Sequence, residues 1–347
     1  MKVSDFRSDT VTRPTAAMRA AMAAAELGDD VLDGDPTVRA LEARVAEWVG
    51  KHGALFVPSG TMANQVALGA WIRPGDEFVV ERSAHVVCWE AGAPAALHGA
   101  QPVTILAEDG RLPLDEVRRA LRMQSVHCPR TVLLATEQSF MGSGAAAGGR
   151  AVPLEHLRAL KSLAEERGLA VHMDGARLAN AVVASGVSAR DFGATADSVS
   201  VCFSKGLGAP VGSAICGDAE FLERARRVRK RLGGWMRQAG VIAAAALHAL
   251  EHHVERLKQD HALARAAAEV LDAVDGIECP PAEVETNIVM ARVTRPDLDA
   301  PALSIHLREH GVLALPQTQR CLRVVTHMDV GPEDVARLEA GLAAVRA

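Results

Sequence analysis

The sequence Ser204-Lys205-Gly206-Leu207-Gly208 directly follows a short apolar stretch at residues 199–203, which is typical of a buried strand. A second motif, Asp174-Gly175-Ala176-Arg177, directly follows another such stretch at residues 169–173. In open α/β sheets, ligands bind in the crevice beyond the carboxyl ends of the strands. We therefore expect Lys205 and Asp174 to share one crevice at the edge of a sheet.

Strand and helix patterns alternate over the first two thirds of the chain. One helix is marked by Asp35-Pro36-Thr37, an acidic cap with proline at the first helical position, and another by residues 154–166. This alternation predicts an α/β fold with a mostly parallel sheet that is flanked by helices on both faces. The expected strands are residues 54–57, 78–80, 103–106, 132–135, 169–173, 199–203 and 213–216.

The length of 347 residues exceeds what one hydrophobic core usually supports, so two domains are expected. From about residue 238 the pattern changes to a long Ala-rich helical stretch, followed by short strands and helices. We predict a large α/β domain at residues 1–245, including the N-terminal segment, and a smaller C-terminal α+β domain at residues 246–347. The elements expected in the smaller domain are strands at 288–293, 312–315 and 322–325, a helix at 302–310 and a final helix.

Composition favours an enzyme of soluble metabolism that acts on a small molecule. Net charge is −5, with 38 basic and 43 acidic residues well mixed, which argues against a nucleic-acid or membrane surface. The start of the chain lacks the apolar core of a signal peptide, and no run reaches the length of a membrane span. We expect a cytoplasmic protein. Residues 224–231 hold six cations, which we interpret as a solvated helix face or subunit contact rather than a nucleic-acid site.

The lysine and aspartate motifs together indicate pyridoxal 5'-phosphate (PLP) chemistry. PLP needs a lysine amine that holds its aldehyde as a Schiff base, and a carboxylate that keeps its pyridine nitrogen protonated. Lys205 and Asp174 are the candidates. Most lysines are solvated surface residues, so Lys205 alone would be weak evidence. The neighbouring motifs favour the functional role.

A phosphate site is predicted at Pro58-Ser59-Gly60-Thr61, which follows one strand and opens the helix at residues 62–71. Free backbone N–H groups, the helix dipole and the hydroxyls of Ser59 and Thr61 would bind the phosphate there. The alternative is a simple capped turn. Its position after a strand places this motif in the same crevice as Asp174 and Lys205.

Two arginines are candidates for the carboxylate of an amino-acid substrate. Arg177 lies three residues past Asp174, and Arg323 lies in an apolar run at residues 322–325, an unusual place for an unpaired charge. His85 and His127 are possible bases or ring-stacking groups, although most of the 13 histidines must be structural or solvated. His172 could form a His-x-Asp metal pair with Asp174, but without a third ligand we interpret it as a core histidine and predict no metal.

Recognisable motifs extend over nearly the whole chain. They are Phe6-Arg7-Ser8-Asp9-Thr10, Gly28-Asp29-Asp30-Val31, Pro58-Ser59-Gly60-Thr61, Ala84-His85, Glu90-Ala91-Gly92, Asp174-Gly175-Ala176-Arg177, Ser204-Lys205-Gly206-Leu207-Gly208, Met236-Arg237-Gln238 and Arg323-Val324-Val325-Thr326-His327. On these residues the chain resembles the PLP-dependent low-specificity L-threonine aldolases of fold type I, within the threonine aldolase and beta-eliminating lyase group.

The resemblance implies a role for each site residue. Lys205 would carry the cofactor and Asp174 would pair with its pyridine nitrogen, while Gly60 and Thr61 bind the phosphate and His85 stacks on the ring. Ser8, Arg177 and Arg323 would hold the substrate carboxylate, with His127 near the substrate hydroxyl. Lys230 and Arg237 match positions that reach the cofactor site across a subunit interface. Relatives of this family are typically homotetramers built from catalytic dimers.

The implied reaction cleaves the Cα–Cβ bond of L-threonine or L-allo-threonine to give glycine and acetaldehyde. Four departures from the family pattern bear on the substrate: Leu32 replaces tyrosine, Phe140 histidine, and Ala93 and Trp235 glycine. A more apolar pocket would favour bulkier β-substituents, as in phenylserine. The alternatives are β-elimination or cleavage of an α-substituted β-hydroxy amino acid on the same scaffold. Which histidine is the base stays open.

Overall fold

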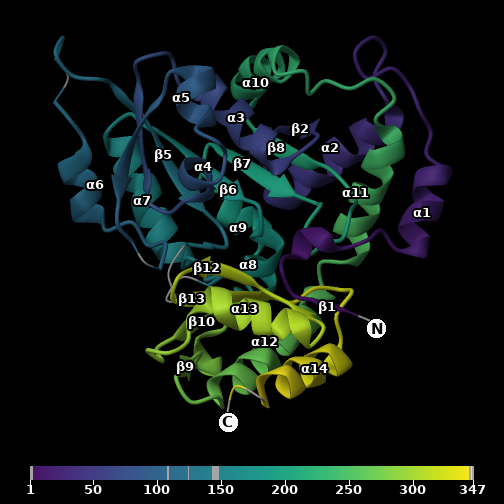
Figure 1. The fold of residues 1–347 in the computed structure, drawn as a ribbon. Helices are drawn as coiled ribbons and strands as arrows, with labels where there is room; N and C mark the ends of the chain where they lie inside the picture. The colour runs from purple at the N-terminus through teal and green to yellow at the C-terminus, as the bar shows by residue number, and fades with distance from the viewer. Residues whose placement is uncertain (1–2, 108, 124, 143–147, 344, 346–347) are drawn as a thin grey trace.

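The computed structural model describes residues 3–107, 109–123, 125–142, 148–343 and 345 (Figure 1). A seven-stranded sheet with the order β2-β8-β7-β6-β5-β3-β4 forms the centre of the larger part. Strands β7, β6, β5, β3 and β4 run parallel, whereas β8 is antiparallel to both β7 and β2. The predicted α/β fold is therefore confirmed. The strands are β2 (Gly53–Val57), β3 (Glu77–Glu81), β4 (Gln101–Ile105), β5 (Thr131–Glu137), β6 (Ala170–Gly175), β7 (Ser198–Cys202) and β8 (Ser213–Gly217).

Each of the seven expected strands is present within two residues of its expected bounds, and β4 starts two residues earlier than expected. It begins at Gln101, before Pro102, and Leu106 beyond its end is exposed. Proline cannot donate a hydrogen bond to a neighbouring strand, so the sequence pattern placed the start after it. Because β4 is the edge strand, next to β3 alone, Pro102 is accommodated there.

Helices cover both faces of this sheet. Alternate residues of β2 show the division, since Phe56 belongs to the core cluster that contains residues of α2, α7 and α11, while Leu55 belongs to the cluster that contains residues of α3 and α10. The predicted cap of α2 is confirmed, with the Asp35 carboxylate accepting the amides of Thr37 and Val38. The helices are α1 (Ala16–Ala23), α2 (Pro36–Val49), α3 (Gly60–Trp71), α4 (His85–Cys88), α5 (Ala93–His98), α6 (Leu114–Ala120), α7 (Leu154–Glu166), α8 (Leu178–Ser185), α9 (Ala189–Gly193), α10 (Ala219–Arg231) and α11 (Gly240–His252).

The C-terminal part has a sheet and a core of its own. Its antiparallel strands follow the order β12-β13-β10-β9, and α12, α13 and α14 pack against them. The single strand expected at residues 312–315 is in fact two, because β11 pairs with the N-terminal strand β1 whereas β12 pairs with β13. The elements are β9 (Ile277–Glu278), β10 (Ile288–Val293), β11 (Val312–Leu313), β12 (Leu315–Thr318), β13 (Cys321–Val325), α12 (Leu257–Asp272), α13 (Ala300–Glu309) and α14 (Pro332–Ala343).

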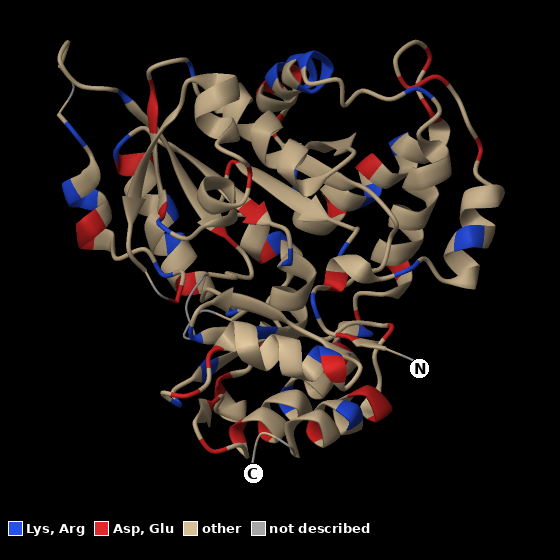
Figure 2. Cartoon of the chain, in the orientation of Figure 1, with Lys and Arg blue, Asp and Glu red and all other residues tan. Residues whose placement is uncertain are grey.

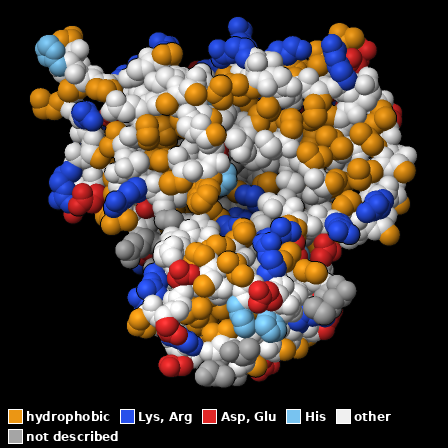
Figure 3. All heavy atoms as spheres, in the orientation of Figure 1, with side chains coloured by type: hydrophobic (Ala, Val, Ile, Leu, Met, Phe, Trp, Pro, Cys, Tyr) orange, Lys and Arg blue, Asp and Glu red, His pale blue; other side chains and the backbone are white. Residues whose placement is uncertain are grey.

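The N-terminal segment runs along the junction between the two parts. Strand β1 (Ser4–Asp5) lies beside β11, and the 3-10 helix η1 (Asp9–Val11) follows directly. On the face drawn in Figure 3, a hollow opens at this junction, and Lys or Arg and His side chains are visible in it. The division at residues 245 and 246 stays a prediction, and it falls inside α11.

Candidate active site

Asp174 lies near the carboxyl end of β6, where its neighbours in the sheet are Glu137 of β5 and Ser200 of β7. Its Oδ1 accepts hydrogen bonds from the Ala176 amide at 3.0 Å and the Ser200 hydroxyl at 3.3 Å. Burial raises the pKa of Asp174, but the charges of Lys205 and His85 outweigh it, and the pKa lies below the usual value. The side chain is therefore an ionised carboxylate in a buried position.

Lys205 lies in the loop that follows β7, the strand next to Asp174. Its main chain is fixed, because its carbonyl oxygen accepts the Gly208 amide at 2.8 Å and the Thr12 hydroxyl at 3.1 Å. Its ammonium group makes no hydrogen bond or ion pair with the described residues, yet its charge acts on Asp174 and on Asp9. The amine is thus held near two carboxylates without being tied to either.

A buried amide links Asp174 to the residues around it. Asn64, on the first turns of α3, donates its two Nδ2 hydrogens to Asp174 Oδ2 at 2.7 Å and to Glu90 Oε1 at 2.8 Å. Its Oδ1 accepts from His172 Nε2 at 3.2 Å. Burial lowers the pKa of His172 to about 4, so this imidazole is neutral near pH 7. His172 thus supports the site from the core.

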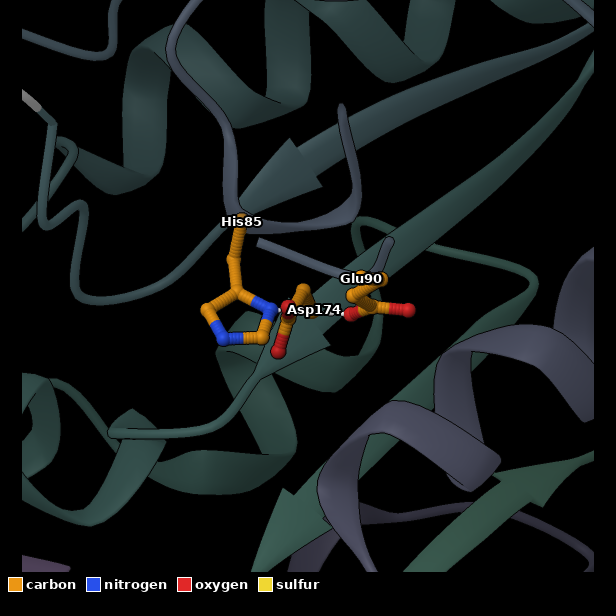
Figure 4. Close-up of side chains that lie close together, drawn as sticks. All are labelled: His85, Glu90 and Asp174. Carbon is orange, nitrogen blue, oxygen red and sulfur yellow. Dashed lines mark hydrogen bonds and ion pairs between the residues drawn. The ribbon is translucent and has the colours of Figure 1, made fainter. Parts of the chain in front are cut away.

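His85 begins α4 and extends its ring toward Asp174 and Glu90 (Figure 4). Its Nδ1 lies 2.9 Å from Glu90 Oε1, and Gln65 Nε2 donates to the other oxygen of Glu90 at 2.6 Å. One ligand atom from each of His85, Glu90 and Asp174 lies within 4.8 Å of the other two. The carboxylates are already engaged by amide donors, and we propose no metal there.

The first turn of α3 is open for a phosphate. The hydroxyl and carbonyl oxygens of Ser59 accept hydrogen bonds from the amides of Met62 and Ala63. The amides of Gly60 and Thr61, at the start of the same helix, have no such partner within the described residues. A Cβ atom at Gly60 would meet no protein atom closer than the Ser213 hydroxyl at 3.7 Å. Among the described residues, this hydroxyl and the Cys202 sulfur at 3.9 Å lie at ordinary contact distance, so Gly60 is not crowded and its backbone leaves room for a ligand to approach.

Ser213 places a further hydroxyl beside the first turn of α3. It begins β8 between Val57 and Cys202, is fully buried, and its Oγ has no hydrogen-bond partner among the described residues. Buried polar groups are nearly always paired, so an unpaired hydroxyl beside two free amides indicates a missing acceptor. The donor set suits a phosphate. Together with Asp174 and Lys205, these residues fit PLP.

The two arginines predicted for the substrate differ in their partners. Arg177 is buried and donates from Nε and Nη2 to the Asp9 carboxylate at 2.9 and 2.7 Å. Burial raises the pKa of Asp9, but Arg177 and then Lys205 lower it to about 2, so both members of the pair are charged. Arg177 therefore lies in the site as half of an ion pair.

Arg323, on β13, has no carboxylate partner within the described part of the chain. Its Nη2 donates to the Arg7 carbonyl at 3.2 Å, its Nη1 to the Met141 sulfur at 3.3 Å, and its buried Nε to no described atom. Burial lowers the pKa of Arg323, and the nearby charge of Arg177 lowers it further. Ser8 follows Arg7 and is half-buried. An unpaired, largely buried guanidinium is well suited to a substrate carboxylate.

Three predicted site residues are not joined to this cluster by any described contact. His127 is exposed in the segment between α6 and β5, which extends from the edge of the molecule in Figure 1. Lys230 is exposed near the end of α10, with its Nζ 5.8 Å from the ring centre of Trp235, and Arg237 pairs with Asp29. Figure 2 shows the basic surface of α10 at the top of the molecule.

The departures from the family pattern lie mostly away from the cluster. Phe140 is 1% exposed and packs in the large core, and Leu32 is exposed on a loop. Trp235 donates from Nε1 to Asp30 at 2.7 Å and lies under Arg229. Ala93 closes the turn after Glu90 by donating its amide to the Glu90 carbonyl.

The sequence motifs predicted no role for the side chains of Asp9, Asn64, Ser213 or Glu90, which the structure brings into the site. Asn64 and Gln65 are polar within the otherwise apolar stretch at residues 62–68, which is the signal that could have identified them. Ser213 carries no such signal, because a serine beside a strand is common.

The chain is similar to known proteins over nearly its whole length. The profile of the Beta-eliminating lyase family matches residues 5–294. The chain is 42% identical over 340 residues to a probable low-specificity L-threonine aldolase 2 of Arabidopsis thaliana, covering 96% of this chain and 95% of that protein. It is also 42% identical over 340 residues to the low specificity L-threonine aldolase of Escherichia coli K12, covering 97% of each.

Solved structures share the fold. A threonine aldolase of Leishmania major superposes with a TM-score of 0.82 at 19% identity, covering 99% of both chains. A putative L-allo-threonine aldolase of Listeria monocytogenes superposes with a TM-score of 0.79 at 21% identity, covering 99% of this chain and 96% of the other. Within the described residues, no helix combines the length and apolar character needed to cross a membrane.

Proposed function

The chain belongs to the beta-eliminating lyase family, and we propose that it is a PLP-dependent aldolase that cleaves the Cα–Cβ bond of β-hydroxy-α-amino acids. L-threonine and L-allo-threonine would give glycine and acetaldehyde. The observation that carries the proposal is the placement of Lys205 beside the buried Asp174 carboxylate, at the ends of the neighbouring strands β7 and β6. An amine and an ionised carboxylate in one buried site are what this cofactor requires.

When bound, PLP condenses with an amino group and takes up the electron pair that is released as a bond to Cα breaks. The chain's own residues supply the rest. Asp174 holds a proton on the pyridine nitrogen because its carboxylate stays ionised in a buried position. The amides of Gly60 and Thr61 and the hydroxyls of Ser59, Thr61 and Ser213 would hold the phosphate.

The substrate carboxylate would be held by the two arginines of the site. Arg323 offers an unpaired guanidinium, and Arg177, fixed by Asp9, adds a second positive group beside it. Ser8 would contribute its hydroxyl. A carboxylate held by two guanidinium groups fixes the orientation of the bonds to Cα, and therefore which of them breaks.

A base must remove the proton of the substrate β-hydroxyl. His85 lies in the site, with its Nδ1 on Glu90, whereas His127 would reach a site only in another subunit. We propose His85 as the main base and His127 as a group that orients the hydroxyl. Changing each to Asn and following aldehyde release over a pH series tests this, because the main base should show the larger loss, roughly 10²–10⁴-fold. Wild-type rates in both variants would exclude both histidines.

We propose a homotetramer built from catalytic dimers. Lys230, Arg237 and His127 are exposed and lie outside the cluster, so their proposed contacts with cofactor or substrate require a second subunit. Met123 and Val126, in the same segment as His127, are among the exposed large apolar side chains and suit burial against a partner. Mixing K205A subunits with H127N subunits should restore activity if His127 acts in trans, and should not if it acts in its own chain.

We also propose a cytoplasmic location. All six cysteines are free, and Cys88 and Cys128 are exposed, which suits a compartment that keeps thiols reduced. Fractionation of cells that express the tagged protein would test the location.

The substrate range is best tested with a panel of β-hydroxy amino acids. Because Phe140 packs in the core and Leu32 is exposed on a loop, the expectation of a larger β-substituent needs this comparison of threonine with phenylserine. The alternative reaction, β-elimination, would release ammonia and a keto acid in place of glycine and an aldehyde.

The cofactor attachment is tested separately from turnover. Protein incubated with PLP should absorb in the near ultraviolet to visible range, and borohydride reduction followed by peptide mapping should place the cofactor on Lys205. Attachment at another lysine would refute the assignment.

A further inference from the structure

Glu90 has a buried carboxylate that is paired with a histidine and, among the described residues, with no lysine or arginine. Its side chain is fully buried between α4 and α5. Its partners are the amides of Asn64 and Gln65 and the Nδ1 atom of His85. Burying a carboxylate is costly unless it is hydrogen-bonded and its charge is balanced. Among these partners, His85 is the one that can become positive.

The contact determines which nitrogen of His85 carries the proton. Both oxygens of Glu90 accept amide hydrogens, so this carboxyl group acts as an acceptor and the hydrogen between Glu90 Oε1 and His85 Nδ1 belongs to the imidazole. The Nε2 atom faces away from Glu90 and Asp174 in Figure 4, and it has no hydrogen-bond partner among the described residues. In the neutral ring, Nε2 is therefore the atom that is free to accept a proton.

We propose that Glu90 is a positioning residue for His85, which holds the Nδ1–H form of the ring and makes Nε2 the nitrogen that exchanges a proton with the substrate. The proposal rests on the aldolase function proposed above. Glu90 acts by orienting His85 and does not itself contact the substrate or the cofactor.

The surrounding charges support this assignment. Burial lowers the pKa of His85, but the hydrogen bond to Glu90 and then the charge of Asp174 raise it above the usual value, against the opposing charge of Lys205. Glu137, whose carboxylate accepts the His85 amide at 3.0 Å, is the other acidic group that faces this residue. Burial and then Asp174 raise the pKa of Glu137, which limits its share of the negative charge. Glu90 is thus the main carboxylate in direct contact with the ring.

The Asn64 amide lies between the carboxylates of Glu90 and Asp174. One Nδ2 hydrogen is donated to each of Glu90 and Asp174, and its position is supported by His172. The amide therefore separates the carboxylate that would serve the pyridine nitrogen from the carboxylate that serves His85.

The test is the substitution Glu90→Gln, which keeps the volume and removes the charge. The imidazole of His85 would be titrated by NMR with labelled histidine, in the protein with and without PLP, and assigned by comparison with His85→Asn. The expected result is a lower His85 pKa in E90Q in both forms. Glu77→Gln is the control, because Glu77 is also buried but lies at the start of β3, outside the site, and should leave the His85 pKa unchanged.

A double-variant cycle separates this role from a merely structural one. If Glu90 acts through His85, E90Q should reduce aldehyde release by up to roughly 10²–10⁴-fold and should add little loss to H85N. Additive losses, or an unchanged His85 pKa, would overturn the proposal. Should E90Q fail to fold, Glu90→Asp gives the same comparison with a smaller shift, because the charge stays but the contact lengthens. The titration needs no turnover, so a protein that released no aldehyde would disprove the proposed function and leave this test intact.

Discussion

The guanidinium of Arg177 is clamped by the carboxylate of Asp9 through two parallel hydrogen bonds, from Nε to Oδ2 at 2.9 Å and from Nη2 to Oδ1 at 2.7 Å. Both residues are buried, and Asn287 donates to the same Oδ2 at 3.1 Å. The pair joins the N-terminal segment to the turn after β6. Asp9 balances the charge of Arg177 and fixes the position of its guanidinium group. The positive charge that is not balanced within the site therefore belongs to Arg323.

Arg323→Gln should therefore weaken binding of the amino-acid substrate more than binding of the cofactor. A hydrogen bond to a charged group is worth about 1.5–3 kcal/mol, so KM for threonine should rise by roughly 10- to 100-fold. The PLP dissociation constant, measured by absorbance titration, should stay near wild type. Arg292→Gln is a matched control, since Arg292 lies on the adjacent strand β10 and pairs with Glu278 at the surface. Equal changes in KM for the two variants would count against the role of Arg323.

Asp174→Asn should separate cofactor binding from turnover. The amide keeps the shape of the side chain but cannot hold a proton on the pyridine nitrogen, so PLP should bind while aldehyde release falls strongly. Cofactor occupancy would be measured by absorbance, and turnover by coupled detection of aldehyde. Near-normal turnover at full occupancy would remove Asp174 from its proposed role.

Much of the fold could be predicted from periodicity. The α/β order, the cap at Asp35 and helix α7 followed from local pattern, because each depends on residues close in sequence. The pairing of β1 with β11 did not, since it joins residues 4 and 5 to residues 312 and 313 in a contact that no local pattern encodes. The start of β4 was obscured by Pro102, which only an edge position tolerates.

The site was predictable where a motif follows a strand and unpredictable where partners are distant. Lys205, Asp174 and Gly60 were identified because each lies at the end of a strand in a recognisable turn. The partners of Asp174 and Arg177, namely Asn64 and Asp9, come from other parts of the chain and meet them only in the folded structure. His127 shows a different limit, because it is exposed and no described contact joins it to the cluster, so its role in a second subunit stays a proposal.

Ser213→Ala should lower cofactor affinity without lowering stability. The Ser213 hydroxyl is buried without a partner in the described chain, so its removal costs the free protein no hydrogen bond. Binding of PLP should weaken by roughly tenfold, while pyridoxal, which lacks the phosphate, should bind as in wild type. Ser198→Ala is the control for stability, because that buried hydroxyl accepts from Trp71 and bonds His172 and its loss should reduce the free energy of unfolding. Equal weakening of PLP and pyridoxal binding by S213A would show that the hydroxyl does not meet the phosphate.

The last prediction concerns acid stability and depends on His261, which lies on α12 outside the cofactor site. Its Nε2 accepts from Asn180 Nδ2 at 3.2 Å, and burial, followed by the charge of Arg265, lowers its pKa from 6.5 to about 4. The imidazole of His261 therefore binds a proton more weakly in the folded protein than in the unfolded chain. The stabilisation is complete above pH 6.5 and is lost as the pH falls toward 4, at about 1.4 kcal/mol per pH unit.

The contributions of Glu42 and Asp260 to stability change in the opposite direction as the pH falls, because burial raises the pKa of each carboxyl group to about 7. Wild type must therefore be compared with a variant rather than with itself at another pH. His261→Gln keeps an acceptor for Asn180 and cannot be protonated, so the stability difference between the two proteins should change by about 1.4 kcal/mol per pH unit between pH 6.5 and 4, in favour of the variant at the acid end. Urea unfolding at several pH values measures this difference. A difference that is independent of pH would mean that the folded protein binds a proton at His261 as readily as the unfolded chain.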